Sequence, residues 1–212
     1  NNTSNYSLMR KYYFLLLAAT AIFSSCEKDP DLSKMDSDFT VYTQYDPEAD
    51  FSTASTYFLP DSILTAGGGM QAVYWKDENA QTLIKQIESE MNTRNYSRES
   101  EKENAQLGVQ VSYVENTTHV SGLWWDTGYW GPFWGGGWYY PYPVSYNYDT
   151  GTLVIEIVDL RDKKTTDAKL PVIWRTTNSG MLYGNNQLNL QLVQRSIEQA
   201  FNQSTYINHK AE

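Results

Sequence analysis

The stretch Thr152-Leu153-Val154-Ile155-Glu156-Ile157-Val158 decides the fold class, because it is the clearest strand pattern in the chain. It is rich in β-branched residues and alternates along its length, as strands within a sheet do. Asp149-Thr150-Gly151 before it is typical of a hairpin turn, and Arg161-Asp162-Lys163-Lys164 after it is a charged turn. A further strand begins at Val172-Ile173-Trp174. This part of the chain therefore predicts a sheet.

Three earlier segments have the same period of two. Residues 39–45 alternate until Asp46-Pro47 interrupts them, and a second short strand is predicted at residues 56–59, where Pro60 ends it. Residues 107–114 alternate again. These segments supply further strands for the sheet.

Two segments have the spacing of amphipathic helices. The first starts after Asp77, which we expect to be its N-cap, and ends near Asn95. Its apolar positions are Ala80, Leu83, Ile84, Ile87 and Met91, and those of the second helix are Leu190, Val193, Ile197, Ala200 and Phe201. The pattern predicts an α+β fold in the order ββαβββα, an antiparallel or mixed sheet with both helices packed on one face. We expect Trp174 to be buried under a helix.

A long aromatic and glycine-rich loop, Gly122–Tyr148, is inserted between two predicted strands. It holds five of the seven tryptophans, and its Gly and Pro residues exclude a regular helix or strand. We considered a structural flap or partner surface, a platform for sugars, and a contact with the membrane interface. The candidate binding surface comprises Trp124, Trp125, Tyr129, Trp130, Phe133, Trp134, Trp138, Tyr139 and Tyr140.

The N-terminal part of the chain has the layout of a secretory signal. Arg10-Lys11 precede an uncharged apolar run at residues 12–23, and Ser24-Ser25-Cys26 follow. The run is too short to span a bilayer, and Phe23-Ser24-Ser25-Cys26 resembles the lipobox of bacterial lipoproteins. That resemblance implies that residues 1–26 are removed as a signal, with residues 1–8 an upstream extension, and that acyl chains on Cys26 hold the protein to the membrane.

The remaining chain divides into a tether, one domain and a tail. Residues 27–38 are polar and charged, which predicts a flexible tether; its Glu27 and Asp29 resemble surface-export tags, although a solvated linker is an equal alternative. Residues 39–207 form a single domain, and residues 208–212 a C-terminal tail. The expected location is the envelope of a Gram-negative bacterium, anchored to the outer membrane and facing either the periplasm or the outside.

Composition limits the partners and the chemistry. The formal net charge of −9 becomes more negative once the signal is removed, so we expect no nucleic-acid partner. Cys26 is the single cysteine, which excludes an internal disulfide and a thiolate metal site. The two histidines are His119, beside the aromatic loop, and His209, in the predicted tail. We expect no metal and no cofactor.

The sequence gives little support for a catalytic site. A Ser-His-Asp set could be built only on His119, and the G-x-S-x-G motif is missing. Asp159 and Asp162 are candidates for the paired carboxylates of glycoside hydrolases, but residues at this spacing beside a strand end usually form a turn. We therefore predict no catalytic residues.

Several of these segments together resemble the bacterial lipoprotein family called domain of unknown function 4136. Asp50-Phe51-Ser52 with Thr56-Tyr57 is similar to its opening motif, and Asn95-Tyr96 with Ala105-Gln106-Leu107 to its second. The segment Gly151–Asp159, followed by Val172-Ile173-Trp174-Arg175, is the best match. The chain departs from the family at Asn95, Gln106 and Thr176, where Gly, Asp and Gly are expected. The resemblance covers about residues 39–207 and implies a fold and an envelope location, not an activity.

The sequence as a whole predicts a lipid-anchored envelope protein that is not an enzyme and acts as a binding or structural module. Envelope proteins and glycans are the expected partners besides the membrane. The alternative is a glycan-binding surface lipoprotein that uses the aromatic loop.

Overall fold

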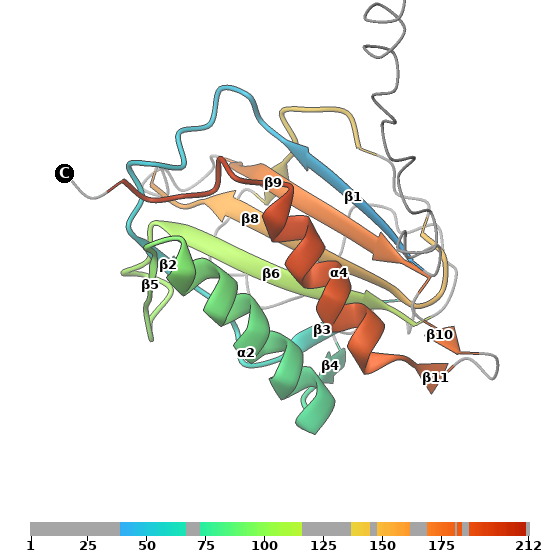
Figure 1. Cartoon of the computed structure of the whole chain (residues 1–212). Coiled ribbons are helices and arrows are strands. Elements are labelled where there is room, and N and C mark those ends of the chain that lie inside the picture. The colour runs from blue at the N-terminus through green and yellow to red at the C-terminus, as the bar shows by residue number, and fades with distance from the viewer. Residues whose placement is uncertain are drawn as a thin grey trace, which may run out of the picture. The chain divides into compact units, whose positions relative to one another are not determined.

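The computed structural model describes residues 39–66, 73–115, 137–144, 148–161, 169–180, 182–183 and 187–210. These residues form a mixed β-sheet with two helices, as the α+β prediction requires (Figure 1). Cys26 and the segments expected to be the signal and the tether lie outside the described residues.

The main sheet has nine strands in the described part of the chain. Its path runs β1-β9-β8-β6-β2-β5, with β3 beside β6, β4 beside β3 and β7 beside β9. The pairs along β1-β9-β8-β6 are antiparallel, whereas β2 and β3 run parallel to β6. The strands are β1 (Thr40–Tyr45), β2 (Thr56–Phe58), β3 (Ile63–Ala66), β4 (Val73–Trp75), β5 (Ser97–Arg98), β6 (Leu107–Val114), β7 (Trp138–Tyr139), β8 (Thr152–Asp159) and β9 (Leu170–Ser179); β10 (Leu182–Tyr183) and β11 (Gln187–Leu188) form a separate pair.

Both predicted helices are present, as α2 (Glu78–Thr93) and α4 (Leu190–Asn202). The Asp77 carboxylate accepts a hydrogen bond from the Ala80 backbone N–H at 3.0 Å, which confirms the predicted N-cap. After α2 the chain turns at Asn95, whose φ of 66° is in the left-handed region that Asn tolerates. Asn189 caps α4 in the same way as Asp77 caps α2. Neither helix combines the length and apolarity needed to cross a bilayer.

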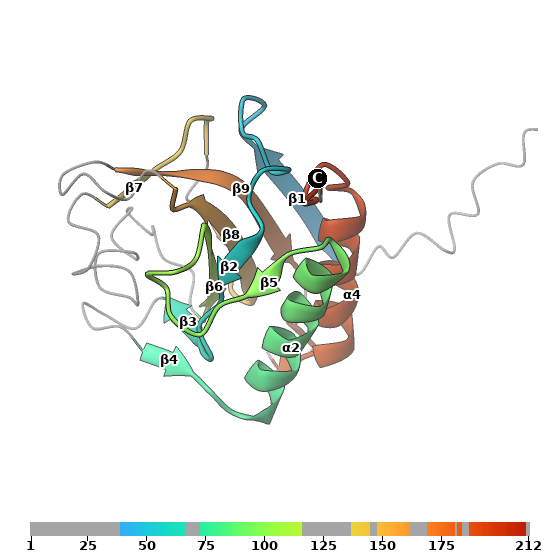
Figure 2. The same ribbon diagram turned by 90° about the vertical axis from the view of Figure 1, so that its left-hand side faces the viewer.

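The main core lies between the helices and one face of the sheet. Figure 2 shows α2 and α4 on this side and β7 on the other. Trp174 has no exposed surface, and its ring lies 5.2 Å from that of Phe201 on α4. Its indole Nε1–H donates to the Ser204 hydroxyl at 3.0 Å. The prediction that Trp174 is buried under a helix is confirmed.

The predicted order ββαβββα is incomplete. It omits β3 and β4 before the first helix, and also β5, β7, β10 and β11. Several of these strands have only two or three residues, too few for a period of two to be recognised. The predicted turn at residues 149–151 is present. Gly151 has a φ of 83°, and its backbone N–H donates to the Val114 carbonyl. The turn joins the long insert to β8 and does not link two strands directly.

The predicted tail at residues 208–212 begins with three residues that are held by the fold. The backbone N–H of His209 donates to the Arg94 carbonyl, and that of Lys210 to the Ser52 carbonyl. Asn95 Nδ2 bonds the Asn208 side chain at 3.1 Å, and His209 Nδ1 lies 2.8 Å from the Ser52 carbonyl oxygen. The ordered domain therefore continues to Lys210, because these contacts tie the end of the chain to the end of α2.

Candidate functional site

The face of the sheet opposite the helices carries a row of polar residues across four strands. Gln110 lies opposite Glu156, Glu156 opposite Arg175, and Arg175 opposite Gln44. Directly paired residues point to the same side of a sheet, so the four side chains share this face. Leu153, Ile155 and Ile157 alternate with the polar positions of β8 and belong to the main core. We call this the helix-free face.

At the centre of the row, Glu156 and Arg175 form a buried ion pair. Arg175 Nε lies 3.3 Å from Glu156 Oε1, and both side chains are almost completely inaccessible. The Nε atom makes no directed hydrogen bond, so the attraction between the two charges is the main link. Tyr140 completes the carboxylate's contacts by donating its hydroxyl to the same Oε1 at 2.5 Å.

Tyrosines enclose the arginine of this pair. Arg175 Nη2 donates to the Tyr148 hydroxyl, and its guanidinium carbon lies 5.3 Å from the Tyr148 ring centre and 5.9 Å from that of Tyr140. Tyr140 in turn meets Tyr142 edge-on, with ring centres 6.0 Å apart. We call Glu156, Arg175, Tyr140, Tyr142 and Tyr148 the buried polar cluster.

Burial controls the ionisation of this cluster. It raises the pKa of Glu156 above its ordinary value, although Arg175 and the Tyr140 hydroxyl act in the opposite direction. It also raises the pKa of Tyr140 and Tyr142, and the neighbouring Glu156 charge adds to both shifts. Both phenols therefore stay protonated at physiological pH, and Tyr140 acts as a donor to the carboxylate.

The cluster fastens the last part of the aromatic insert to the sheet. Residues 137–144, which we call the aromatic arm, begin with Gly137 at φ 72° and continue as β7, parallel to β9. The Leu170 N–H donates to the Gly137 carbonyl at 3.0 Å, and Gln44 Nε2 donates to the Pro143 carbonyl at 2.7 Å. With Tyr140 on Glu156, the arm is held at its start, middle and end.

The described residues of the predicted binding surface differ in how far they are buried. Trp138 is only 5% exposed and packs with Val158, Leu170 and Val172 in a second core cluster. It is therefore a core residue and cannot belong to an exposed surface, which corrects the prediction for this ring. Tyr139 is 43% exposed, and Tyr140 is half-buried with its hydroxyl on Glu156. The other members, Trp124, Trp125, Tyr129, Trp130, Phe133 and Trp134, lie outside the described residues.

Glu156 and Arg175 were not assigned a role by sequence reasoning. A signal for Glu156 exists, because it is the one charged residue inside the apolar stretch Leu153–Val158. Charged residues are rarely fully buried without a partner, so this position predicts a counter-charge on a neighbouring strand. The identity of that counter-charge depends on the register between β8 and β9, which includes a bulge near Val158.

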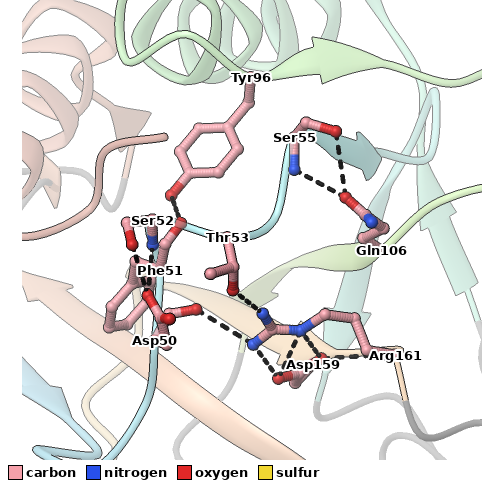
Figure 3. A network of polar contacts seen from close by, with 9 residues as sticks. All are labelled: Asp50, Phe51, Ser52, Thr53, Ser55, Tyr96, Gln106, Asp159 and Arg161. Carbon is pink, nitrogen blue, oxygen red and sulfur yellow. Dashed lines mark hydrogen bonds and ion pairs between the residues drawn. The ribbon is translucent and has the colours of Figure 1, made fainter. Parts of the chain in front are cut away.

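A second polar network lies at one end of the sheet and joins the motifs quoted above (Figure 3). The Arg161 guanidinium contacts both carboxylate oxygens of Asp159, the Thr53 hydroxyl and the Asp50 carbonyl. The Asp159 carboxylate also accepts the Arg161 backbone N–H at 3.0 Å, in agreement with a turn at this position. Asp162, its proposed partner, lies outside the described residues.

The segment Asp50–Thr56 is the centre of this network. Tyr96 donates its hydroxyl to the Phe51 carbonyl at 2.7 Å, and Gln106 Oε1 accepts the Ser55 N–H at the same distance. The Asp50 carboxylate accepts from the hydroxyl and the N–H of Ser52, and these bonds lower its pKa. The contacts of Arg161, Tyr96 and Gln106 join this segment to distant parts of the chain, so the network links the ends of several strands.

The described residues contain few other features that could bind a ligand or a metal ion. A pocket of about 640 Å³ is lined mainly by charged side chains, and its Arg98 is already paired with Glu88 and Asp61. Within the ranges described, no three residues among His, Cys, Asp and Glu come together as metal ligands would. His119 lies outside those ranges.

Comparison with known proteins gives one clear likeness. The sequence matches the model of the family described as "Domain of unknown function (DUF4136)" over residues 41–204. A DUF4136 family protein from Bacteroides thetaiotaomicron VPI-5482 is 36% identical with a TM-score of 0.73, covering 82% of this chain and 100% of that chain. PelC dodecamers from Paraburkholderia phytofirmans are 9% and 11% identical with TM-scores of 0.40 and 0.41, over 82% of this chain and 99% of theirs. No curated protein matches the sequence.

Proposed function

The chain belongs to the DUF4136 family, and we propose that it is a lipid-anchored protein of the cell envelope that acts by binding rather than by catalysis. The proposed anchor is Cys26, whose acyl chains hold the protein to the outer membrane of a Gram-negative cell. The order of Arg10-Lys11, the apolar run at residues 12–23 and Cys26 supports this anchor. Several acyl chains attach a protein firmly, because each buried methylene contributes about 0.8 kcal/mol.

The bond between Tyr140 and Glu156 carries the proposal for binding. It lies in the interior and holds the aromatic arm on the helix-free face, while the adjacent Tyr139 keeps its ring at the surface. A segment that is fixed at its base loses less entropy when it binds a partner than a free loop does. The insert is therefore proposed to present its aromatic side chains to an envelope partner from a rigid base.

The described titratable groups with altered pKa support binding rather than catalysis. Glu156 is inaccessible and occupied by Arg175 and Tyr140, so it cannot reach a substrate. Tyr57 and Tyr96 have raised pKa values because they are buried, and their hydroxyls are used in contacts with α2 and with the Phe51 carbonyl. Burial within the fold accounts for all three raised pKa values.

The test is an exchange of the insert that leaves the arm in place. Val114 and Trp138 lie at opposite ends of the sheet, because Val114 pairs with Thr152 whereas Trp138 pairs with Leu170. A Gly-Ser linker replacing residues 116–136 must therefore be about 12 residues long to span the sheet. A photo-crosslinking residue at Tyr139 in the cell should give protein adducts in the wild type and lose them in the exchange variant. The same residue at exposed Lys85 on α2 is the control, and equal adducts at both positions would reject the binding surface.

Glycan binding is the second candidate, favoured by the exposed ring of Tyr139 on a fixed strand. Aromatic faces stack on the apolar faces of sugars, and a ring that is already held in place is well suited to this contact. The soluble domain should then bind envelope polysaccharides on a glycan array, with weaker binding by Tyr139→Ala. Unchanged binding in this variant and in the exchange variant would exclude the insert as the glycan site.

A further inference from the structure

β1 forms an edge of the main sheet, and its outer side has no neighbouring strand in the described part of the chain (Figure 1). On its inner side it pairs with β9 over all six of its residues, from Thr40 opposite Ser179 to Tyr45 opposite Trp174. The other strands of this sheet with a single neighbour beside them are β4, β5 and β7, and each has only two or three residues. β1 is therefore the longest open edge of the described sheet.

One backbone bond identifies the groups of β1 that point outward. The N–H of Asp46, directly after β1, donates to the Ile173 carbonyl on β9 at 2.9 Å. Residues of an antiparallel pair alternate between those that bond to the neighbouring strand and those that do not. Since Asp46 bonds to β9, the N–H and carbonyl groups of Val41, Thr43 and Tyr45 face away from β9. These three residues form a template on which one more strand can pair.

The sequence of β1 lacks the features by which proteins protect an open edge. Lysine, proline and β-bulges usually prevent a further strand from pairing there. Thr40–Tyr45 has no charged residue and no proline, and its register with β9 runs without a shift. Tyr42 is 58% exposed on the helix-free face, and Tyr45 is 42% exposed on the other face. An added strand would therefore cover part of both rings.

Opposite charges lie at the two ends of β1. Arg195 on α4 is exposed, and its guanidinium carbon lies 5.9 Å from the ring centre of Phe39, just before the strand. Glu48 is exposed just after the strand. Two antiparallel copies of β1 would bring the Arg195 end of each copy beside the Glu48 end of the other. The charges and the backbone groups are thus self-complementary about a two-fold axis.

We propose that β1 pairs with β1 of a second copy of this chain, antiparallel and about a two-fold axis at Thr43. In this register Thr43 lies opposite the partner's Thr43, and Val41 lies opposite the partner's Tyr45. All three outward residues of each strand then take part, in about six backbone hydrogen bonds, and the two sheets become continuous. This contact is distinct from the binding surface proposed for the insert and does not depend on the lipid anchor.

The size of the contact determines how firmly the two copies associate. Six residues from each copy form an interface at the low end of the range for specific complexes, roughly 1,200 Å² or less in total. We therefore expect a reversible dimer, whose population rises with the concentration of the protein.

Disulfide trapping in the full chain, expressed in cells, tests the pairing. Thr43→Cys places two thiols in a hydrogen-bonded pair whose Cα atoms are about 5.5 Å apart, within the range of a disulfide. Thr93→Cys, at an exposed position at the end of α2, is the matched control. After mild oxidation, cross-linked dimer should be several-fold more abundant for Thr43→Cys than for Thr93→Cys or the wild type. Peptide masses should show a disulfide that joins position 43 of the two copies.

Exchange of the end charges tests whether the added strand comes from a second copy. Arg195→Glu or Glu48→Arg alone brings like charges together, so each should reduce the cross-linking of Thr43→Cys several-fold. The double variant Arg195→Glu with Glu48→Arg should restore it. Within one copy these two residues lie at opposite ends of a six-residue strand, so restoration requires contact between copies. Circular dichroism of each variant verifies that the fold is intact.

Dimer that is no more abundant for Thr43→Cys than for Thr93→Cys would overturn the proposal. A disulfide between position 43 and Cys26 of the same chain would also overturn it, because the N-terminal segment would then cover the edge. A disulfide with a different protein would have the same consequence, since another partner would then take the place of the second copy.

Discussion

The hydroxyl of Tyr140 donates a hydrogen bond to the carboxylate of Glu156, a residue at the centre of the sheet and inaccessible to solvent. This single contact connects the aromatic insert to the polar row on the helix-free face. Because Arg175 shares the same carboxylate oxygen, the insert is attached to two neighbouring strands at once. The aromatic arm is therefore part of the fold, and the surface it presents has a fixed base.

Tyr140→Phe should destabilise the protein by about 1–3 kcal/mol, because the buried Glu156 carboxylate loses a hydrogen bond that no water can replace. Chemical denaturation of the soluble domain measures the change. Tyr139→Phe is the matched control, and its free energy of unfolding should stay close to that of the wild type because its ring is exposed. Equal effects in the two variants would contradict the role given to Tyr140.

The stability contributed by Glu156 should depend on pH. Burial raises the pKa of Glu156 above its ordinary value of 4.5, so the folded protein retains this proton to a higher pH than the unfolded chain. The stability that the protonated Glu156 contributes to the fold is therefore fully present below pH 4.5, and it is lost as the pH rises through the folded-state pKa. Glu156→Gln removes this titration.

The free energy of unfolding of the wild type, minus that of Glu156→Gln, should thus fall as the pH is raised from 4.5 toward neutrality. Denaturation curves of both proteins across this range provide the measurement. A difference that grows with pH would mean that Arg175 outweighs burial and lowers the pKa of Glu156 instead.

The main strands and both helices were predictable because their patterns are long enough to read. The eight residues of β8 are rich in β-branched side chains, and the Asp77 cap marks the start of α2. Strands such as β5 and β7, with two residues each, carry no readable period. They form because β2 and β9 offer unpaired edges, which is a tertiary effect outside local sequence.

The candidate site was predicted only in part. The aromatic composition of the insert was evident, but the division between buried Trp138 and exposed Tyr139 depends on how β7 lies against β9. The pairing of Glu156 with Arg175 likewise depends on register between strands that are far apart in the sequence. Such relationships require the fold, because a buried charge in the sequence predicts a counter-charge without identifying which residue supplies it.

Arg161→Lys should destabilise the domain by about 1–3 kcal/mol, since an ammonium group cannot reproduce the bidentate contact with Asp159 together with the bonds to Thr53 and Asp50. Thermal denaturation followed by circular dichroism measures the effect. Lys85→Ala, at an exposed position of α2, serves as a control for the loss of a surface cation. A melting temperature unchanged by Arg161→Lys would show that the network of Figure 3 contributes little.

Trp174→Ala should cost about 3–5 kcal/mol, as truncation of a large aromatic residue in a core does. Its ring has no exposed surface and packs on Phe201, so the cavity cannot fill without moving α4. Urea denaturation provides the value. Trp174→Phe should recover much of the loss, because it restores most of the apolar volume, although the smaller ring also loses the indole bond to Ser204. An alanine variant as stable as the wild type would contradict the packing of α4 on β9.

The most direct test of the central proposal is the intact mass of the mature protein extracted from cell membranes with detergent. We predict a chain that begins at Cys26 and carries the added mass of a diacylglyceryl group, and a Cys26→Ala variant that is left unprocessed and free of acyl chains. A wild-type protein that retains residues 12–23, or begins at Cys26 with a free thiol, would contradict the lipid anchor on which the proposed function depends.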